Sequence, residues 1–148
     1  MTLLPRSARL AVMATLDVAL HARARPVSSR ALAARHNLPP RRLESLLQAL
    51  VRAGVLKSLR GPQGGYELAR ERRRLTLGEI VRIALRAEAE EESAGSGLRL
   101  LDAVLEPVIA SAEEELLARL DGITLDDLHG RALVAGFGAT EAGAEFEI

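Results

Sequence analysis

The sequence predicts a mainly α-helical domain with one small β-hairpin, joined to a long helix. Residues 40–53 place four leucines on one side of a helix, at about 100° per residue: Leu43, Leu46, Leu47 and Leu50. Residues 55–60 and 66–69 suit two short strands, and the segment between them, 61–65, contains three glycines and a proline. The centre of the fold is therefore expected to be a helix followed by a tight hairpin.

The opposite side of the 40–53 helix is polar and basic. It carries one row without an acid, made of Arg41, Ser45, Gln48 and Arg52. Guanidinium, amide and hydroxyl groups suit phosphate oxygens and base edges in a DNA major groove. For a lone amphipathic helix a solvated face is the commoner explanation. The hairpin that follows is what favours nucleic-acid binding here.

A shorter helix is expected just before, over residues 27–35. Ser28 is its natural N-cap, and Asn37 in the following turn tolerates left-handed backbone angles. Two short helices joined by such a turn form a helix-turn-helix, and the added hairpin makes it a winged helix-turn-helix. The exposed N–H groups at the start of this helix, with Ser29 and Arg30, suit the DNA backbone.

Four segments resemble the Rrf2 family of bacterial transcription regulators. The run 60–69, RGPQGGYELA, is similar to the wing signature of that family and is the most specific segment. Residues 16–20 resemble its first helix, 38–44 the start of its recognition helix and 123–128 its final short helix. The resemblance runs from residue 6 to residue 129. Pro39 and Arg42 depart from the pattern, in which a serine and an aromatic residue are commoner at those places.

The resemblance implies a homodimer that binds a palindromic operator in double-stranded DNA, and repression by occluding a promoter is the expected direction of control. The residues expected to contact DNA are Ser28, Ser29, Arg30, Arg41, Arg42, Ser45, Gln48, Arg52, Lys57, Arg60, Gly64, Gly65 and Tyr66. A long helix over residues 98–120 carries an aliphatic seam at three- and four-residue spacing. Core packing alone would explain the seam, but the resemblance implies a dimerisation surface formed by Leu98, Leu101, Leu105, Val108, Ala112 and Leu116.

The chain is expected to divide into four parts. These are a winged helix-turn-helix domain over 1–87, an acidic flexible loop over 88–97, the dimerisation helix and a short helix over 98–129, and a flexible tail over 130–148. In the first helix, over 7–22, one stripe is expected to face the core, made of Leu10, Met13, Leu16, Asp17 and Leu20 and flanked by Val12 and Val18. Pro107 falls inside the long helix and should kink or interrupt it. Thr124 is expected to cap the short helix that follows.

The two halves of the chain carry opposite charge. Residues 1–86 contain 17 basic side chains against five acidic ones, and residues 87–148 contain three against fifteen. The formal net charge of zero thus conceals segments of +12 and −12. A GC-rich genome would explain why 19 of the 20 basic residues are arginine, but not their segregation. A basic half suits a polyanionic partner such as DNA.

Composition and spacing also exclude several kinds of site. Many Rrf2-like proteins place iron–sulfur cysteines in the region of 88–97, whereas this chain has no cysteine at all. His21, His36 and His129 are expected to form no cluster, so we predict neither a metal site nor a cofactor. No nucleophile–base pair or phosphate-binding loop indicates an enzyme.

Other expectations concern the setting of the protein. No apolar run is long enough to cross a membrane, and no secretion signal is recognisable, so a cytoplasmic location is expected.

A second hypothesis keeps the winged fold but makes it a protein-interaction module that partners or antagonises another regulator. The missing sensor cysteines and the acidic second half favour that hypothesis. Neither hypothesis decides whether the chain also binds an effector molecule or a partner protein.

Overall fold

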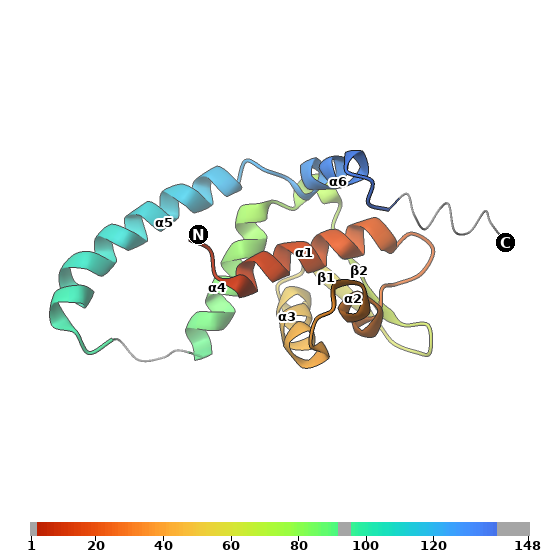
Figure 1. Cartoon of the computed structure of the whole chain (residues 1–148), viewed down its shortest axis with the longest axis horizontal. Coiled ribbons are helices and arrows are strands. Elements are labelled where there is room, and N and C mark those ends of the chain that lie inside the picture. Colours follow the sequence, from red (N-terminus) through yellow and green to blue (C-terminus); the bar gives the residue numbers. More distant parts are fainter. Residues whose placement is uncertain (1–2, 92–95, 139–148) are drawn as a thin grey trace.

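The computed structural model describes residues 3–91 and 96–138. Helix α1 (Arg6–His21) lies across the middle of the molecule, and α2 (Ser29–His36), α3 (Pro40–Arg52) and the hairpin of β1 (Leu56–Leu59) and β2 (Gly65–Leu68) lie together on one side of it (Figure 1). The remaining elements are η1 (Arg72–Arg74), α4 (Leu77–Glu91), η2 (Leu101–Leu105), α5 (Glu106–Leu120) and α6 (Leu125–Val134). The predicted fold class, mainly helical with a small two-stranded wing, is confirmed.

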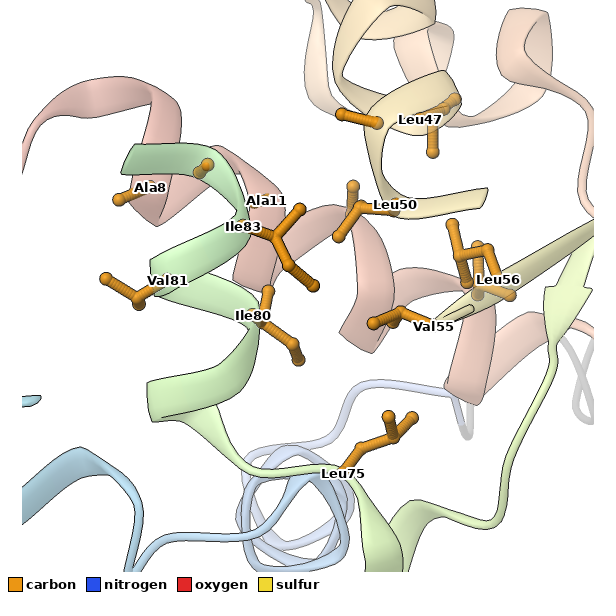
Figure 2. Packing of buried hydrophobic residues seen from close by; sticks show 14 of the residues in the cluster. Ala8, Ala11, Leu47, Leu50, Val55, Leu56, Leu75, Ile80, Val81 and Ile83 are labelled. Carbon is orange, nitrogen blue, oxygen red and sulfur yellow. The ribbon is translucent and has the colours of Figure 1, made fainter. Parts of the chain in front are cut away.

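The core lies where α1, α3 and α4 meet. Figure 2 shows Ile80 and Ile83 of α4 beside Leu50 of α3 and Val55, which precedes β1, and all four are buried. The predicted stripe of α1 is buried only in part: Asp17 and Leu20 are buried, whereas Leu10, Met13 and Leu16 are half-buried. Small residues outside that stripe are fully buried, as Ala8, Ala11 and Ala14. Alanine methyls let two helix backbones approach closely, so a tight crossing selects the small face.

Backbone hydrogen bonds join the start of the C-terminal helix, α6, to the winged domain. The Leu125 N–H donates to the Leu75 carbonyl at 2.8 Å, and the Leu77 N–H donates to the Ile123 carbonyl at 2.9 Å. Thr124 caps α6 as predicted. Its hydroxyl accepts from the Asp127 N–H at 3.1 Å, and the Asp127 carboxylate accepts from the Thr124 N–H at 2.9 Å.

Two helices run past their predicted ends. Helix α4 continues to Glu91, four residues beyond the boundary expected at residue 87. Helix α6 continues to Val134, inside the segment expected to be a flexible tail. Alanine and glutamate have high helix propensity, so the run of them after Arg86 extends α4, which packing has already nucleated. The rest of the tail, from residue 139 onward, lies outside the described residues.

The long helix is interrupted as predicted. Residues 101–105 form a π-helical segment directly before Pro107, and a regular α-helix then runs to Leu120. Proline has no N–H and its ring crowds the carbonyl four residues back, which disfavours a normal α-turn there. The C-terminal half of this helix packs against its own domain, through buried Leu117 and through Arg82 of α4, which pairs with Glu114 and Asp121.

No helix in residues 3–91 and 96–138 has the length and apolarity needed to cross a membrane.

Candidate nucleic-acid interface

Helix α3 presents the predicted polar row to solvent. Its start is set by Pro40, whose missing N–H costs nothing in a first turn, and Gly54 at φ +80° follows its end. The leucines divide as expected, with Leu43, Leu47 and Leu50 buried and Leu46 half-buried. The polar positions are all exposed: Arg41, Arg42, Ser45, Gln48 and Arg52.

The exposed arginines on this face are not engaged inside the molecule. Within the described residues, the side chains of Arg41, Arg42 and Arg52 have no ion-pair or hydrogen-bond partner. An arginine paired to an acid would have to break that pair before binding phosphate. This face can therefore bind a polyanion without first breaking an internal ion pair.

Helix α2 is capped as predicted. The Ser28 hydroxyl accepts from the Ala31 N–H at 3.0 Å, so this side chain is occupied in holding the helix start. Ser29 is half-buried at the first helical position, and Arg30 is exposed. Asn37 ends the helix in the left-handed conformation, with φ +51° and ψ +51°, which turns the chain into α3.

A buried carboxylate fixes α2 against α1, and we refer to this group as the Asp17 cluster: Asp17, His21, Arg35 and His36. Arg35 donates to Asp17 from Nε to Oδ2 at 3.0 Å and from Nη2 to Oδ1 at 2.7 Å. His36 Nε2 lies 2.6 Å from Oδ2, and His21 Nε2 lies 3.8 Å from the same oxygen. The cluster sets the angle at which the helix-turn-helix leaves α1.

The neighbours of Asp17 stabilise the charged form of its carboxylate. Burial of the carboxylate acts to raise its pKa, but the hydrogen bonds from Arg35 and His36 and the charges of Arg35 and His21 outweigh burial. The pKa of Asp17 therefore lies below its ordinary value. His21 and His36 both approach one carboxylate, a contact that the sequence expectations did not include, whereas His129 on α6 lies with Arg72. The signal in the sequence was an aspartate inside an apolar stripe, with a histidine four residues later.

The wing is a short antiparallel hairpin in the register Leu56↔Leu68 to Leu59↔Gly65. Lys57 forms an exposed ion pair with Glu67 at 2.8 Å, directly across the strands, while Arg60 is exposed with no partner in the described part of the chain. Arg60 is thus available to a phosphate, and Lys57 shares its charge with a neighbouring acid.

The base of the wing is held by the segment before α2. Val27 and Tyr66 exchange both backbone hydrogen bonds, at 2.9 and 2.7 Å. Gly65 is required at this crossing, because its φ is +157° and a Cβ there would come within 2.5 Å of the Val27 carbonyl oxygen. The Tyr66 ring is half-buried against the core, and burial together with the charge of Glu44 raises its pKa.

Not every basic residue near the wing is available. Arg70 pairs with Glu79 of α4, and Arg72 lies 3.3 Å from Asp126 and 2.7 Å from His129 Nε2 on α6. These two arginines join the end of the hairpin to the helices behind it. Arg73, whose Nη2 lies 3.9 Å from Glu71 Oε2, and Arg74 are exposed beside the wing.

The predicted residues converge on one side of the molecule. Helices α2 and α3 and the hairpin project together on the side of α1 opposite α6 (Figure 1). This is a helix-turn-helix with an adjacent wing, in which one helix offers base-reading groups and the flanking segments offer backbone N–H groups and cations.

Sequence comparison then identifies the family. Residues 4–131 match the model of the Rrf2 family, described as an iron-dependent transcriptional regulator. The chain belongs to the Rrf2 family. An HTH-type transcriptional regulator of Synechocystis, slr0846, is 34% identical over 139 residues, which cover 92% of this chain and 82% of the relative.

Solved structures of Rrf2 regulators have the same fold. IscR of T. potens superposes with a TM-score of 0.70 at 33% identity, covering 92% of each chain. CymR of Bacillus subtilis, described as its global cysteine regulator, superposes with a TM-score of 0.64 at 29% identity, covering 88% of this chain and 98% of that one. The Rrf2 family consists of DNA-binding transcription regulators and not of enzymes.

The iron dependence in the family description does not fit the residues present. The chain has no cysteine, and no three His, Asp or Glu side chains in residues 3–91 and 96–138 are placed to hold a metal ion. The two imidazoles nearest each other are turned onto the Asp17 carboxylate, which Arg35 already occupies. No regulatory step is assigned to iron in this chain.

Proposed function

We propose that this protein is a homodimeric repressor that binds a palindromic operator without an iron–sulfur cluster. Helix α3 enters the major groove, and the hairpin lies at an adjacent groove or on the backbone. The observation that carries the proposal is the exposed, acid-free row on α3, whose Arg41 and Arg52 have no partner in the described part of the chain.

Each part of this face has a role in the proposal. Arg41, Arg42, Ser45 and Gln48 read base edges, since guanidinium and amide groups make paired hydrogen bonds to guanine and adenine. Arg30, the N–H groups at the start of α2, Arg52 and Arg60 bind phosphates and fix the register. Lys57, Gly64, Gly65 and Tyr66 shape and support the wing.

The exposed aliphatic face of the long helix supports the proposed dimer. Several large aliphatic side chains are exposed there, including Leu98 at 62%, Val104 at 58% and Val108 at 63%. Leu105 and Ala112 continue this face, and Leu101 and Leu116 are half-buried at its edge. Contiguous exposed aliphatic surface on a regulator suits a second copy of the same helix. Two copies would present two α3 helices to successive turns of DNA.

A selection from genomic DNA tests operator binding. Purified protein is incubated with sheared DNA of its own organism near physiological salt, and the retained fragments are sequenced. Enrichment of a palindrome with half-sites about one helical turn apart supports the proposal. Retention without any motif contradicts it and favours a protein-interaction module with a basic surface. Transcription in vitro from an enriched promoter then tests repression, which should increase with protein concentration.

Two substitutions test the residue assignments. Arg41→Ala should weaken operator binding by roughly 1–3 kcal/mol and relax the preference at one base position. Arg60→Ala should weaken binding to all sequences and lower the salt slope by about 0.9 for each phosphate that Arg60 neutralises. Arg119→Ala, on an exposed arginine of α5, is the control and should change neither quantity. Operator affinity like that of the unsubstituted protein in Arg41→Ala would refute the placement of α3.

A further inference from the structure

A cavity lies behind the start of the recognition helix, between the N-terminal turn of α1, the first turns of α3 and the end of α4. Its volume is about 430 Å³, within the range of sites that hold small organic molecules. Most of its wall is aliphatic, with Leu10, Leu38, Leu46 and Ala87 among the contributors. No aromatic residue lines it among the described residues, so a flat ring would find no stacking partner there.

Polar groups converge on this aliphatic cavity. Arg6 of α1 and Arg42 of α3 line it, and neither has an ion-pair partner within the described residues. Glu88 is the single acid among the described lining residues, so the cationic charge exceeds the anionic charge by one. A cavity with an aliphatic wall and unpaired guanidiniums favours a ligand with an aliphatic body and one anionic head.

A third polar group points to a bound ligand. The Ser7 hydroxyl oxygen is buried, and it has no hydrogen-bond partner among the described atoms. Ser7 also lines the cavity. A buried hydroxyl without a partner lowers the stability of a protein, so such groups usually have a partner when the protein is in its working state. A change of the Ser7 side-chain rotamer would turn the hydroxyl toward the cavity, where an anionic oxygen would accept its hydrogen bond.

We propose that this cavity binds a small aliphatic carboxylate, held by Arg6, Arg42 and Ser7, and that binding weakens the hold on DNA. The second half of the proposal rests on the proposed function. Arg42 and Ser45 are shared by the cavity wall and by the exposed DNA-facing side of α3. A carboxylate that draws the Arg42 guanidinium into the cavity removes it from the groove.

Calorimetric titration with sodium octanoate tests the site independently of DNA. The wild-type protein should bind octanoate and should bind octanol at least about tenfold more weakly, because a charged hydrogen bond contributes about 1.5–3 kcal/mol. Ala87→Leu should weaken octanoate binding, because the larger side chain occupies part of the cavity. Octanol binding as tight as octanoate binding would overturn the anionic ligand, and undiminished binding by Ala87→Leu would overturn the location.

Two polar variants test the head-group contacts. Ser7→Ala should weaken octanoate binding several-fold without lowering the thermal stability of the ligand-free protein, since the hydroxyl it removes has no partner among the described atoms. Arg6→Gln should weaken binding about tenfold, while Arg9→Gln, one turn further along α1 and outside the cavity, is its matched control. Equal reductions of affinity in Arg6→Gln and Arg9→Gln would overturn the assignment.

DNA affinity with and without octanoate then tests the coupling. Octanoate should lower operator affinity in the wild-type protein, and the same octanoate concentration should lower that of Ala87→Leu less. An unchanged wild-type affinity in saturating octanoate would overturn the coupling while the site stands. Failure to bind operator DNA before any octanoate is added would instead overturn the proposed function, so the two failures are distinguishable.

Discussion

At the scale of single residues, His129 is a buried histidine held neutral by its neighbour. Only 5% of the residue is exposed, and its Nε2 lies 2.7 Å from Nη1 of Arg72. A guanidinium can only donate, so Nε2 must accept and the ring proton must sit on Nδ1. Burial first, and then the charge of Arg72, lower the pKa of His129 against an opposing effect of Asp126.

This arrangement predicts a loss of stability on acidification. The unfolded chain takes up a proton near the ordinary histidine pKa of about 6.5, whereas the folded chain resists it until lower pH. The free energy of unfolding should therefore fall as pH drops below about 6.5, by at most about 1.4 kcal/mol per pH unit from this residue, and should be unaffected above it. Urea unfolding at pH 5.5 and 7.5 measures the difference.

His129→Gln is the matched variant, because its amide oxygen can still accept from Arg72 and it does not titrate. The difference between the two pH values should shrink in His129→Gln. The same pH dependence in both proteins would contradict a neutral, buried His129.

At the scale of elements, the Asp17 cluster joins α1 to α2, and its contribution can be measured. Asp17→Asn keeps the shape but leaves Arg35 facing a neutral amide, so the free energy of unfolding should fall by about 2–3 kcal/mol, less than for a fully buried pair because Arg35 is 29% exposed. Because the pKa of Asp17 is lowered on folding, this stabilisation is present at neutral pH and is lost as pH falls through the folded-state pKa.

The control is the same exchange at an exposed pair. Glu67→Gln removes the partner of Lys57 on the wing, where 56% of the Lys57 side chain and 32% of the Glu67 side chain are exposed, and should change the free energy of unfolding by less than about 1 kcal/mol. Urea unfolding at pH 7 compares the two variants. Similar values for Asp17→Asn and Glu67→Gln would show that the buried cluster has no special part in holding α2.

The elements that sequence predicted well are those specified locally. Ser28 and Thr124 as N-caps, Asn37 in the turn and the glycines of the hairpin each act on backbone a few residues away, and the described structure has each where it was expected. The burial of α1 was not predictable in the same way. Ranking residues by hydrophobicity selects Leu10 and Met13, but the closeness of α4 decides that alanines are buried instead.

The same distinction between local and long-range contacts applies to the candidate site. The exposed row of α3 follows from helical periodicity, so it could be predicted from sequence alone. The Asp17 cluster joins residues 18 and 19 positions apart, and the cavity behind α3 needs three helices to form. Neither has a local pattern. The ion pairs that Arg70 and Arg72 form within the protein could not be predicted either. The sequence of an arginine run does not indicate whether its partners are acids of the protein or phosphates.

At the scale of the whole molecule, the long helix makes the proposed dimer testable. Its N-terminal half exposes aliphatic residues around Val108, while Leu117 further along is buried in its own domain. Val108→Glu should therefore leave the fold intact and convert a dimer into a monomer, because two copies would bring buried carboxylates together. Sedimentation or light scattering at micromolar concentration gives the mass directly.

Glu113→Gln is the control, because this exposed residue lies on the same helix away from Val108, and it should remain dimeric. Binding to a full palindrome should fall sharply in Val108→Glu, while binding to a single half-site should fall little, because each winged domain keeps its own DNA-binding surface. A mass of one chain for the wild-type protein would contradict the dimer. A dimeric Val108→Glu protein would show instead that the two copies associate through another surface.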